Sequence, residues 1–211
     1  MHAVSRLAAV TALVIASVSC GSVVRTGRGS SYLVVDSMSG IRGAGTLGTP
    51  SATLTSDVIT NVSSPAPCTP DRPCPTVFGD LGEATMHIVM KDEGSVSPTT
   101  ATQVNTITLT RYRVEYIRAD GRNTPGVDVP FAFDGAATGT IPAGGTLNLG
   151  FELVRNIAKR EAPLVQLRRD TNITTNIITT IARVTFYGQD RTGNAVSVTG
   201  QIQVNFGDFG D

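Results

Sequence analysis

Alternation of apolar and polar residues is the main pattern along this chain of 211 residues. It is clearest in residues 83–92, where small or apolar side chains occupy every second position: Ala84, Met86, Ile88 and Met90. A period of two residues is typical of a β-strand that buries one face. Comparable alternation, or short β-branched runs, predict further strands in residues 32–38, 52–62, 127–133, 146–153, 179–187 and 195–206.

Residues 105–117 carry two apolar stripes of opposite phase. A slip of one residue turns every following side chain to the other face of a sheet. We therefore expect a β-bulge near Thr110–Arg111, or a strand that crosses between two sheets. The two stripes comprise Ile107 and Leu109, followed by Tyr112, Val114 and Tyr116.

The β pattern is interrupted in residues 155–170, which contain good helix formers and no sustained alternation. Pro163 suits the first turn of a helix, with residues 164–169 following it. We therefore predict one short helix that crosses between sheets. Strands separated by turn-rich segments, with a single short helix, predict an all-β fold: an antiparallel sandwich of about 7–9 strands.

The last two predicted strands allow a more specific comparison. Residues 178–206 read ITTIARVTFYGQDRTGNAVSVTGQIQVNF, in which a strand ends near Tyr187 and a D-x-x-G-N type turn precedes the final strand. This stretch resembles the closing hairpin of bacterial immunoglobulin-like and fibronectin type III-like domains. The resemblance is best over residues 105–206. It implies an immunoglobulin-like sandwich and carries no functional residues with it.

The start of the chain has a different character. Arg6 precedes an uninterrupted run of apolar and small residues from Leu7 to Val18. A permanent membrane-spanning helix needs about 20 such residues, whereas a secretory signal peptide has a short apolar core after a positive charge. We therefore predict a signal peptide over residues 1–19. A buried N-terminal helix is the alternative.

Cys20 follows this run in the sequence SVSC, residues 17–20. The sequence resembles the lipobox of bacterial lipoproteins, in which the cysteine is lipidated and becomes the N-terminus, although Ser17 replaces the usual leucine. The resemblance implies a lipid anchor on Cys20. Ordinary cleavage after Ser19 is the alternative, because Ser17 and Ser19 also fit a small-x-small site. The odd number of cysteines favours lipidation, since Cys68 and Cys74 can pair with each other.

These patterns divide the chain into three segments: a signal peptide over residues 1–19, a tether over 20–31 and a single β-sandwich domain over 32–211. Gly and Ser dominate the tether. Its last eleven residues, extended at about 3.3 Å each, would reach roughly 35 Å. That length is enough to hold a domain clear of a membrane surface.

Charge and composition narrow the classes of partner. The 17 basic residues balance the 17 acidic ones, so no overall field attracts nucleic acid or an anionic membrane. The chain has no tryptophan and few aromatic residues, which weighs against a face that stacks on sugar rings. We expect no nucleic-acid partner, and no residue pattern indicates a cofactor.

Cys68 and Cys74 lie in a proline-rich loop between predicted strands. Their spacing suits a disulfide or half of a metal site. Further metal ligands are scarce, because the chain after the signal peptide has one histidine and no other cysteine nearby. We therefore predict a disulfide that constrains the loop locally.

His87 is the only histidine after the predicted signal peptide. A serine or cysteine nucleophile would need it as a base, but no acidic residue stands at a position that suggests an orienting role. We predict a solvent-facing histidine on a strand. Several carboxylates and one amide are likewise expected to form turns and not a calcium site: Asp120, Asp190, Asn194, Asp208 and Asp211.

A cluster of basic residues surrounds the predicted short helix. Such a cluster is usually a solvated face, and its alternative role is contact with an anionic envelope polymer or lipid headgroups. The residues are Arg155, Lys159, Arg160, Arg168 and Arg169.

The function expected from these features is that of a non-catalytic interaction or structural lipoprotein of the bacterial cell envelope. It would be held to a membrane through Cys20 and would contact an envelope polymer or a protein. A secreted binding module without a lipid is one alternative. An enzyme or enzyme accessory that uses His87 is another.

Overall fold

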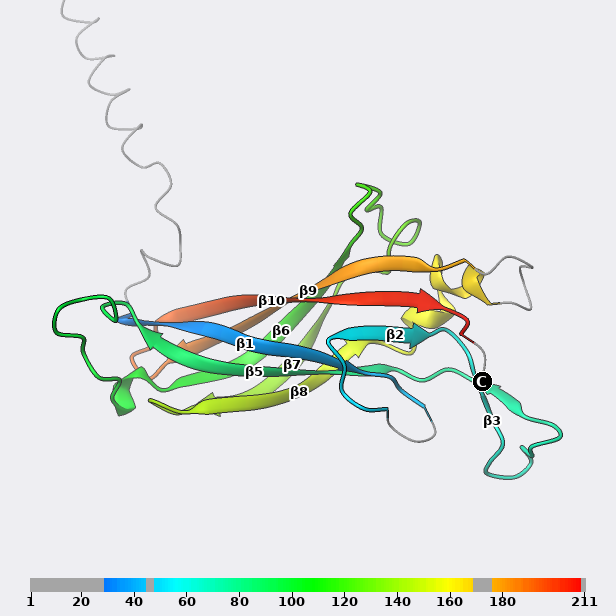
Figure 1. The fold of residues 1–211 in the computed structure, drawn as a ribbon, viewed down its shortest axis with the longest axis horizontal. Helices are drawn as coiled ribbons and strands as arrows, with labels where there is room; N and C mark the ends of the chain where they lie inside the picture. Colours follow the sequence, from blue (N-terminus) through cyan, green and yellow to red (C-terminus); the bar gives the residue numbers. More distant parts are fainter. Residues whose placement is uncertain (1–28, 45–47, 169–175, 210–211) are drawn as a thin grey trace, which may run out of the picture.

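Two facing β-sheets make up most of the structure, which is a computed structural model (Figure 1). It describes residues 29–44, 48–168 and 176–209. One sheet has the order β1–β5–β8, with bounds Ser31–Ile41, Asp80–Met90 and Thr146–Val154. The other has the order β2–β10–β9–β6–β7, with bounds Thr53–Asp57, Ala195–Gly207, Ile178–Asp190, Ile107–Ile117 and Phe133–Ile141. A separate pair consists of β3, Thr60–Val62, and β4, Cys74–Thr76.

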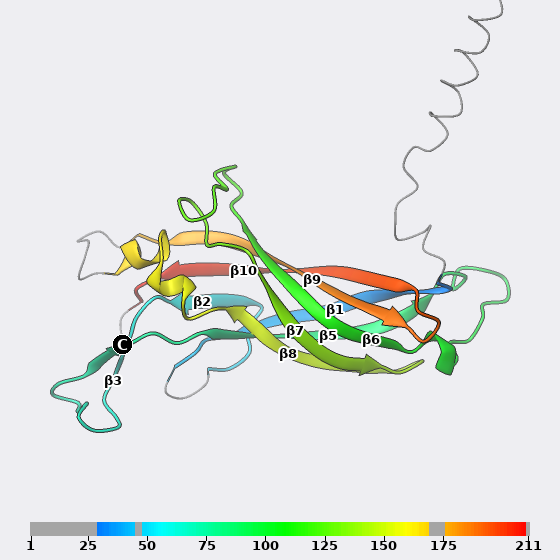
Figure 2. The same cartoon turned by 180° about the vertical axis from the view of Figure 1, so that it is seen from behind.

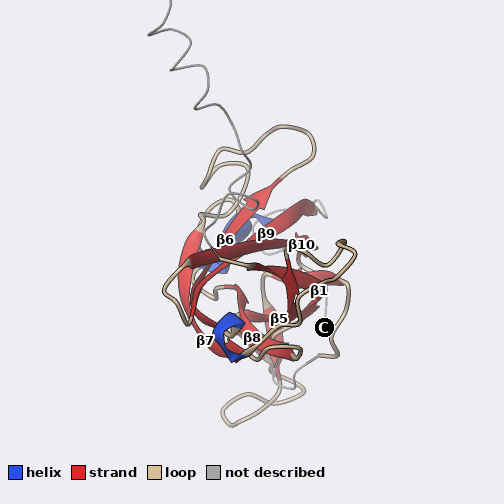
Figure 3. Ribbon diagram, turned by 90° about the vertical axis from the view of Figure 1, so that its left-hand side faces the viewer, coloured by secondary structure: helices blue, strands red, loops and turns tan. Residues whose placement is uncertain are grey.

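The all-β sandwich predicted from the sequence is confirmed, and end-on the two sheets enclose one core (Figure 3). One pair departs from the antiparallel pattern, because β2 pairs with β10 in parallel. The chain turns back after β1, where Gly40 and Ser51 form a bridge, and β2 then enters the sheet beside the end of β10. Residues 58–194 separate β2 from β10 in the chain, which is compatible with parallel pairing because parallel strands need a long connection.

The predicted alternation places the core. Side chains at every second position of β8, β9 and β10 are buried between the sheets. They are Leu149, Phe151 and Leu153, then Thr180, Ala182, Val184 and Phe186, then Ile202, Val204 and Phe206. The predicted face of β5 is also buried, at Ala84, Met86 and Ile88.

The predicted bulge in β6 is confirmed. Pairing of β6 with both of its neighbours shifts register between Leu109 and Arg111. Ile107 and Leu109 before the shift are buried, and so are Tyr112, Val114 and Tyr116 after it. The extra residue therefore lets two stripes of opposite phase face the same core.

The strand expected at residues 127–133 is absent from its place, and β7 begins only at Phe133. The N–H groups of Val127 and Asp128 bond instead to the carbonyl of Thr124 and form a turn. Gly126 has a φ of 76°, which interrupts an extended conformation. The segment from 118 to 132 is thus a loop that projects from the sandwich (Figures 1 and 2).

The crossing between sheets at residues 155–168 is confirmed, but in place of one helix it contains two turns of 3-10 helix. They are η2 at Ala158–Arg160 and η3 at Leu164–Leu167, and Pro163 lies directly before η3. A third such turn, η1, covers Gln103–Asn105. Within the described residues, no helix combines the length and the apolar character that crossing a membrane requires.

The sandwich has two distinct ends (Figures 1 and 2). We call the first the entry end. There the N–H of Lys91 donates to the carbonyl of Ser30, and Asn105 Nδ2 donates to Ser30 Oγ. We call the opposite end the distal end. It carries the β3–β4 pair, the loop from 118 to 132, and η2 and η3.

Candidate functional site

A groove of about 340 Å³ lies at the distal end, where the loop after β6 meets η3 and the start of β9. Apolar side chains that line it or flank it are unusually exposed for their type: Val127 at 68%, Ile177 at 51% and Phe131 at 49%. Phe131 packs over Gly126, where a Cβ would approach the ring to 2.5 Å. This contact and the positive φ of Gly126 fix the shape of the loop.

Arg118, Arg122 and Asp128, on the same loop, form the charged part of the groove lining, and Asp120 pairs with the two arginines. Asp120 Oδ2 lies 2.6 Å from Arg118 Nη2 and 3.3 Å from Arg122 Nε. Asp128 accepts a bond from the N–H of Thr124. Hydrogen bonds from Arg118, above all, lower the pKa of Asp120 to about 2. The groove therefore presents both apolar and charged surface.

The structure separates the residues of the predicted basic cluster. Arg160 is exposed, whereas Arg155 lies over the ring of Phe133 with its Cζ 4.6 Å from the centroid. Arg168 donates from Nη2 to the carbonyl of Lys159. Arg169 lies outside the described residues. Lys159 is fully buried, so it belongs neither to the expected solvated face nor to the alternative surface contact.

Lys159 instead forms a buried ion pair with Asp80. Lys159 Nζ lies 2.8 Å from Asp80 Oδ2, and both side chains are completely shielded from solvent. Ser56 Oγ donates to the same oxygen at 2.6 Å. The N–H of Gly43 donates to the other oxygen, Asp80 Oδ1, at 2.8 Å. Burial lowers the pKa of Lys159, although the attraction of Asp80 opposes the shift.

Four distant segments meet at this pair. Asp80 begins β5, Ser56 lies near the end of β2, Lys159 is in η2, and Gly43 follows β1. Position 43 requires glycine, because a Cβ there would overlap the carbonyl oxygen of Gly79. Beside the pair, Arg42 Nη2 lies 2.5 Å from Asp57 Oδ2, and the Asp57 side chain is also buried. The distal end of the core thus holds a concentrated group of charges.

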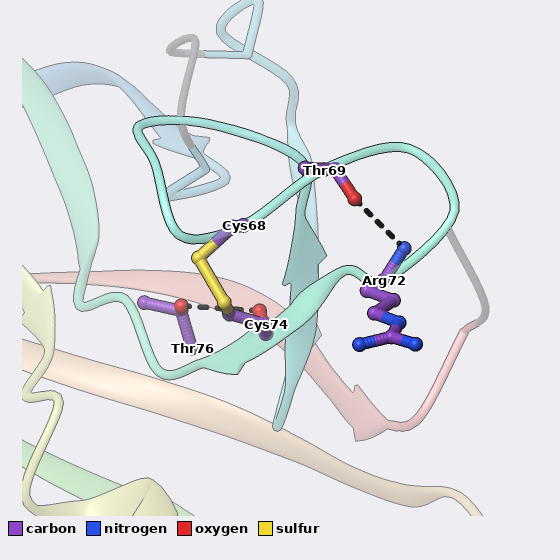
Figure 4. Close-up of a disulfide and its surroundings, with 5 residues drawn as sticks. All are labelled: Cys68, Thr69, Arg72, Cys74 and Thr76. Carbon is purple, nitrogen blue, oxygen red and sulfur yellow. Dashed lines mark hydrogen bonds between the residues drawn. A yellow bond between two sulfur atoms is a disulfide. The ribbon is translucent and has the colours of Figure 1, made fainter.

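The predicted disulfide is present between Cys68 and Cys74 (Figure 4). Their Cα atoms are 5.4 Å apart. Within the loop that it closes, the N–H of Arg72 donates to Thr69 Oγ1. Cys74 begins β4, which pairs with β3 outside the two main sheets. The disulfide therefore constrains an exposed hairpin and not the core.

His87 has an acidic neighbour that the sequence did not indicate. His87 Nδ1 lies 2.7 Å from Asp36 Oδ1, with about a third of each side chain exposed. Asp36 stands at a register shift in β1, which brings it beside β5. His87 is not in the lining of the grooves found among the described residues, although its partner Asp36 lines the one between β1 and β10. The half-exposed position agrees with a histidine on a strand face.

The expected role of Asp190 and Asn194 in a turn is confirmed. Asp190 Oδ1 accepts bonds from the N–H groups of Thr192 and Asn194, and Asp190 Oδ2 accepts one from Asn194 Nδ2. In the part of the chain that the structure describes, no group of three or more His, Cys, Asp or Glu residues is arranged to hold a metal ion. Asp211 lies outside that part.

Comparisons with known proteins add no relative: no protein-family model, no curated protein and no solved structure matches this chain.

Proposed function

We propose that the chain is a non-catalytic interaction module of the bacterial cell envelope, held to a membrane by a lipid on Cys20 and directed away from it at its distal end. The sequence around Cys20 supports the anchor, since a cysteine follows a short apolar core there. Residues 1–28, with Cys20 and most of the tether, lie outside the described residues.

One observation of the fold carries the proposal. The described chain begins at the entry end, and the elements that line the groove, the loop from 118 to 132 and η3, lie toward the opposite end (Figure 1). An anchor that precedes Gly29 would leave the distal end farthest from the membrane. Exposed apolar side chains beside charged ones are typical of a surface that contacts another macromolecule. We therefore assign the groove to a protein partner of the envelope.

Val127 offers a direct test of this assignment. A photo-reactive amino acid at position 127 should form a covalent complex with a partner in intact cells. The matched control is position 96, because Val96 is likewise an exposed valine but lies in the loop at the entry end between β5 and η1. Both chains should fold alike, since neither side chain is part of the core.

The expected result is a discrete product at position 127 that is lost when Ile177, across the groove, is replaced by aspartate. Equal products at positions 127 and 96 would show contact without a preferred surface. No product at position 127, in cells where the chain is intact, would contradict a partner at the groove.

A further inference from the structure

We propose that Lys159 and Asp80 form an intramolecular amide cross-link, in which Nζ of the lysine bonds to Cγ of the aspartate and one molecule of water is released. The two groups are in direct contact, with 2.8 Å between Nζ and Oδ2. They are also wholly buried, so solvent does not compete for either. A reaction between groups held in this way has an effective concentration of about 10⁵ M or more.

The two oxygens of Asp80 have different surroundings, and this difference assigns their roles. Oδ2 faces Lys159 Nζ and also accepts a hydrogen bond from the hydroxyl of Ser56. It is therefore the oxygen that can collect protons and leave. Oδ1 is held by the N–H of Gly43, as a donor would hold the negative charge that develops on a carbonyl oxygen during attack. Oδ1 therefore remains as the oxygen of the amide.

The reaction balances without any other reactant. One proton moves from the ammonium of Lys159 to Oδ2, which leaves a neutral amine and a neutral carboxylic acid. The amine lone pair attacks Cγ and forms the C–N bond. A second proton passes from nitrogen to Oδ2, the Cγ–Oδ2 bond breaks, and water departs. No atom is oxidised or reduced.

Burial favours the amine form of Lys159, which is the nucleophile in this reaction, although the Asp80 carboxylate opposes this shift. Charged groups in a dry interior lose their hydration, and transfer of one proton removes both charges at once. Burial already lowers the pKa of Lys159. Leu153, Val154, Ala158 and Leu164, in or beside the crossing segment, are all buried. The neighbouring ion pair of Arg42 and Asp57 also acts on Lys159, Asp57 by raising its pKa and Arg42 by lowering it.

The cross-link would join η2 to the start of β5. It would therefore tie the crossing segment between the two sheets to the three-stranded sheet by a covalent bond. Such a bond resists extension of the chain, which suits a domain held at one end and bound at the other. This consequence goes beyond the proposed function, and the chemistry does not depend on that function.

Intact mass and peptide mapping of the wild-type chain test the proposal. The mature chain should be lighter by one water than its sequence requires, after allowance for the disulfide, the removal of residues 1–19 and any lipid on Cys20. Trypsin does not cut Arg72–Pro73 or after a modified Lys159, so a branched peptide should join residues 43–91 to residues 156–160. Lys91→Arg is the matched control, because Lys91 is the other lysine of the chain and is exposed.

The variants separate the proposal from other losses of water. Lys159→Arg should restore the sequence mass, whereas Lys91→Arg should keep the deficit. Asp80→Asn should lose ammonia in place of water. A succinimide at Asp134–Gly135 would lower the mass equally but would give no branched peptide, and that result would overturn the proposal. So would a wild-type chain of full mass with a free Lys159, a result that needs no variant to fold.

Discussion

Gly135 leaves room for the side chain of Tyr112, which is packed between the two sheets. It lies on β7 against Tyr112, and a Cβ at this position would overlap the Tyr112 ring. That ring cannot move freely, because it contacts Phe151 at a centroid distance of 5.3 Å and Phe133 at 6.2 Å. Its hydroxyl also accepts a bond from the N–H of Glu152 on the opposite sheet. The absence of a side chain at position 135 therefore makes room for the aromatic cluster.

We expect Gly135→Ala to lower the free energy of unfolding by about 1–3 kcal/mol, because overpacking forces the ring or the strand to shift. Gly150→Ala is the matched control. Gly150 also lies on a strand, but a Cβ there would meet no heavy atom within 4 Å. Its effect should stay within about 0.5 kcal/mol. Denaturant unfolding of both variants measures the difference, and equal losses would contradict the packing argument.

The burial of charged residues is the feature that the sequence predicts least well. Lys159 stands among Arg155, Arg160 and Arg168, so its neighbours in sequence indicate a solvated surface. The partner that permits its burial is Asp80, which begins β5 and lies far from Lys159 in the sequence. A buried charge needs a partner. With no pattern that links the two positions, a single sequence does not reveal the pair.

The bulge in β6 shows the opposite case, in which sequence determines structure locally. The phase of the apolar stripe changes between Leu109 and Tyr112, and the register with β7 and β9 shifts at the same point. Burial on one face is a strong enough requirement to specify this slip. Thr110 is the extra residue, and its side chain is exposed.

Deletion of Thr110 should therefore prevent a cooperative fold, although no buried side chain is removed. The deletion would turn Tyr112, Val114 and Tyr116 toward solvent or force Ile107 and Leu109 out of the core. Thermal unfolding monitored by near-ultraviolet circular dichroism should show no sharp transition. Thr110→Ser, the matched control, keeps the bulge and should unfold as the wild type does. A cooperative transition in the deletion variant near the wild-type midpoint would contradict this account.

Strand β7 was missed because its sequence does not have the expected alternation. Phe133–Ile141 contains mainly small residues, and Gly135 and Gly139 are disfavoured in strands. Close packing explains them, since a Cβ at either position would meet Tyr112 or Leu147. The alternation in residues 127–133 was in turn misleading, because Gly126 and the Thr124 carbonyl organise a turn there. Tertiary contacts therefore override local propensity in β7, whereas local turn hydrogen bonds override the alternation in residues 127–133.

The arrangement of the two ends relates the sandwich to its proposed anchor. Ser31, at the start of β1, pairs with Met90 at the entry end. The buried pair, the disulfide hairpin and the groove all lie toward the other end. Features that stabilise or equip the domain are therefore remote from the point where the tether would join it. Alternation predicts the strands and therefore the outline of the fold. It does not predict which strand ends lie together, so the separation of the two ends is seen only in the structure.

That separation gives the prediction for Cys20. Cys20→Ala should release the protein from membranes without changing its unfolding, because the core begins at β1 and the disulfide uses Cys68 and Cys74. Each buried CH₂ of an acyl chain contributes about 0.8 kcal/mol to membrane attachment, and stable anchoring needs more than one chain. Loss of the lipid should thus move the protein from the detergent phase to the aqueous phase.

Phase partitioning with intact mass of the N-terminal peptide makes the measurement. Replacement of both Cys68 and Cys74 by serine is the control, since it alters the other two cysteines and should leave the protein in the detergent phase. A wild-type chain that begins at Cys20 without a lipid, or that partitions into the aqueous phase, would favour ordinary secretion. The groove could then still bind a partner, because its residues at the distal end do not depend on how the chain is attached.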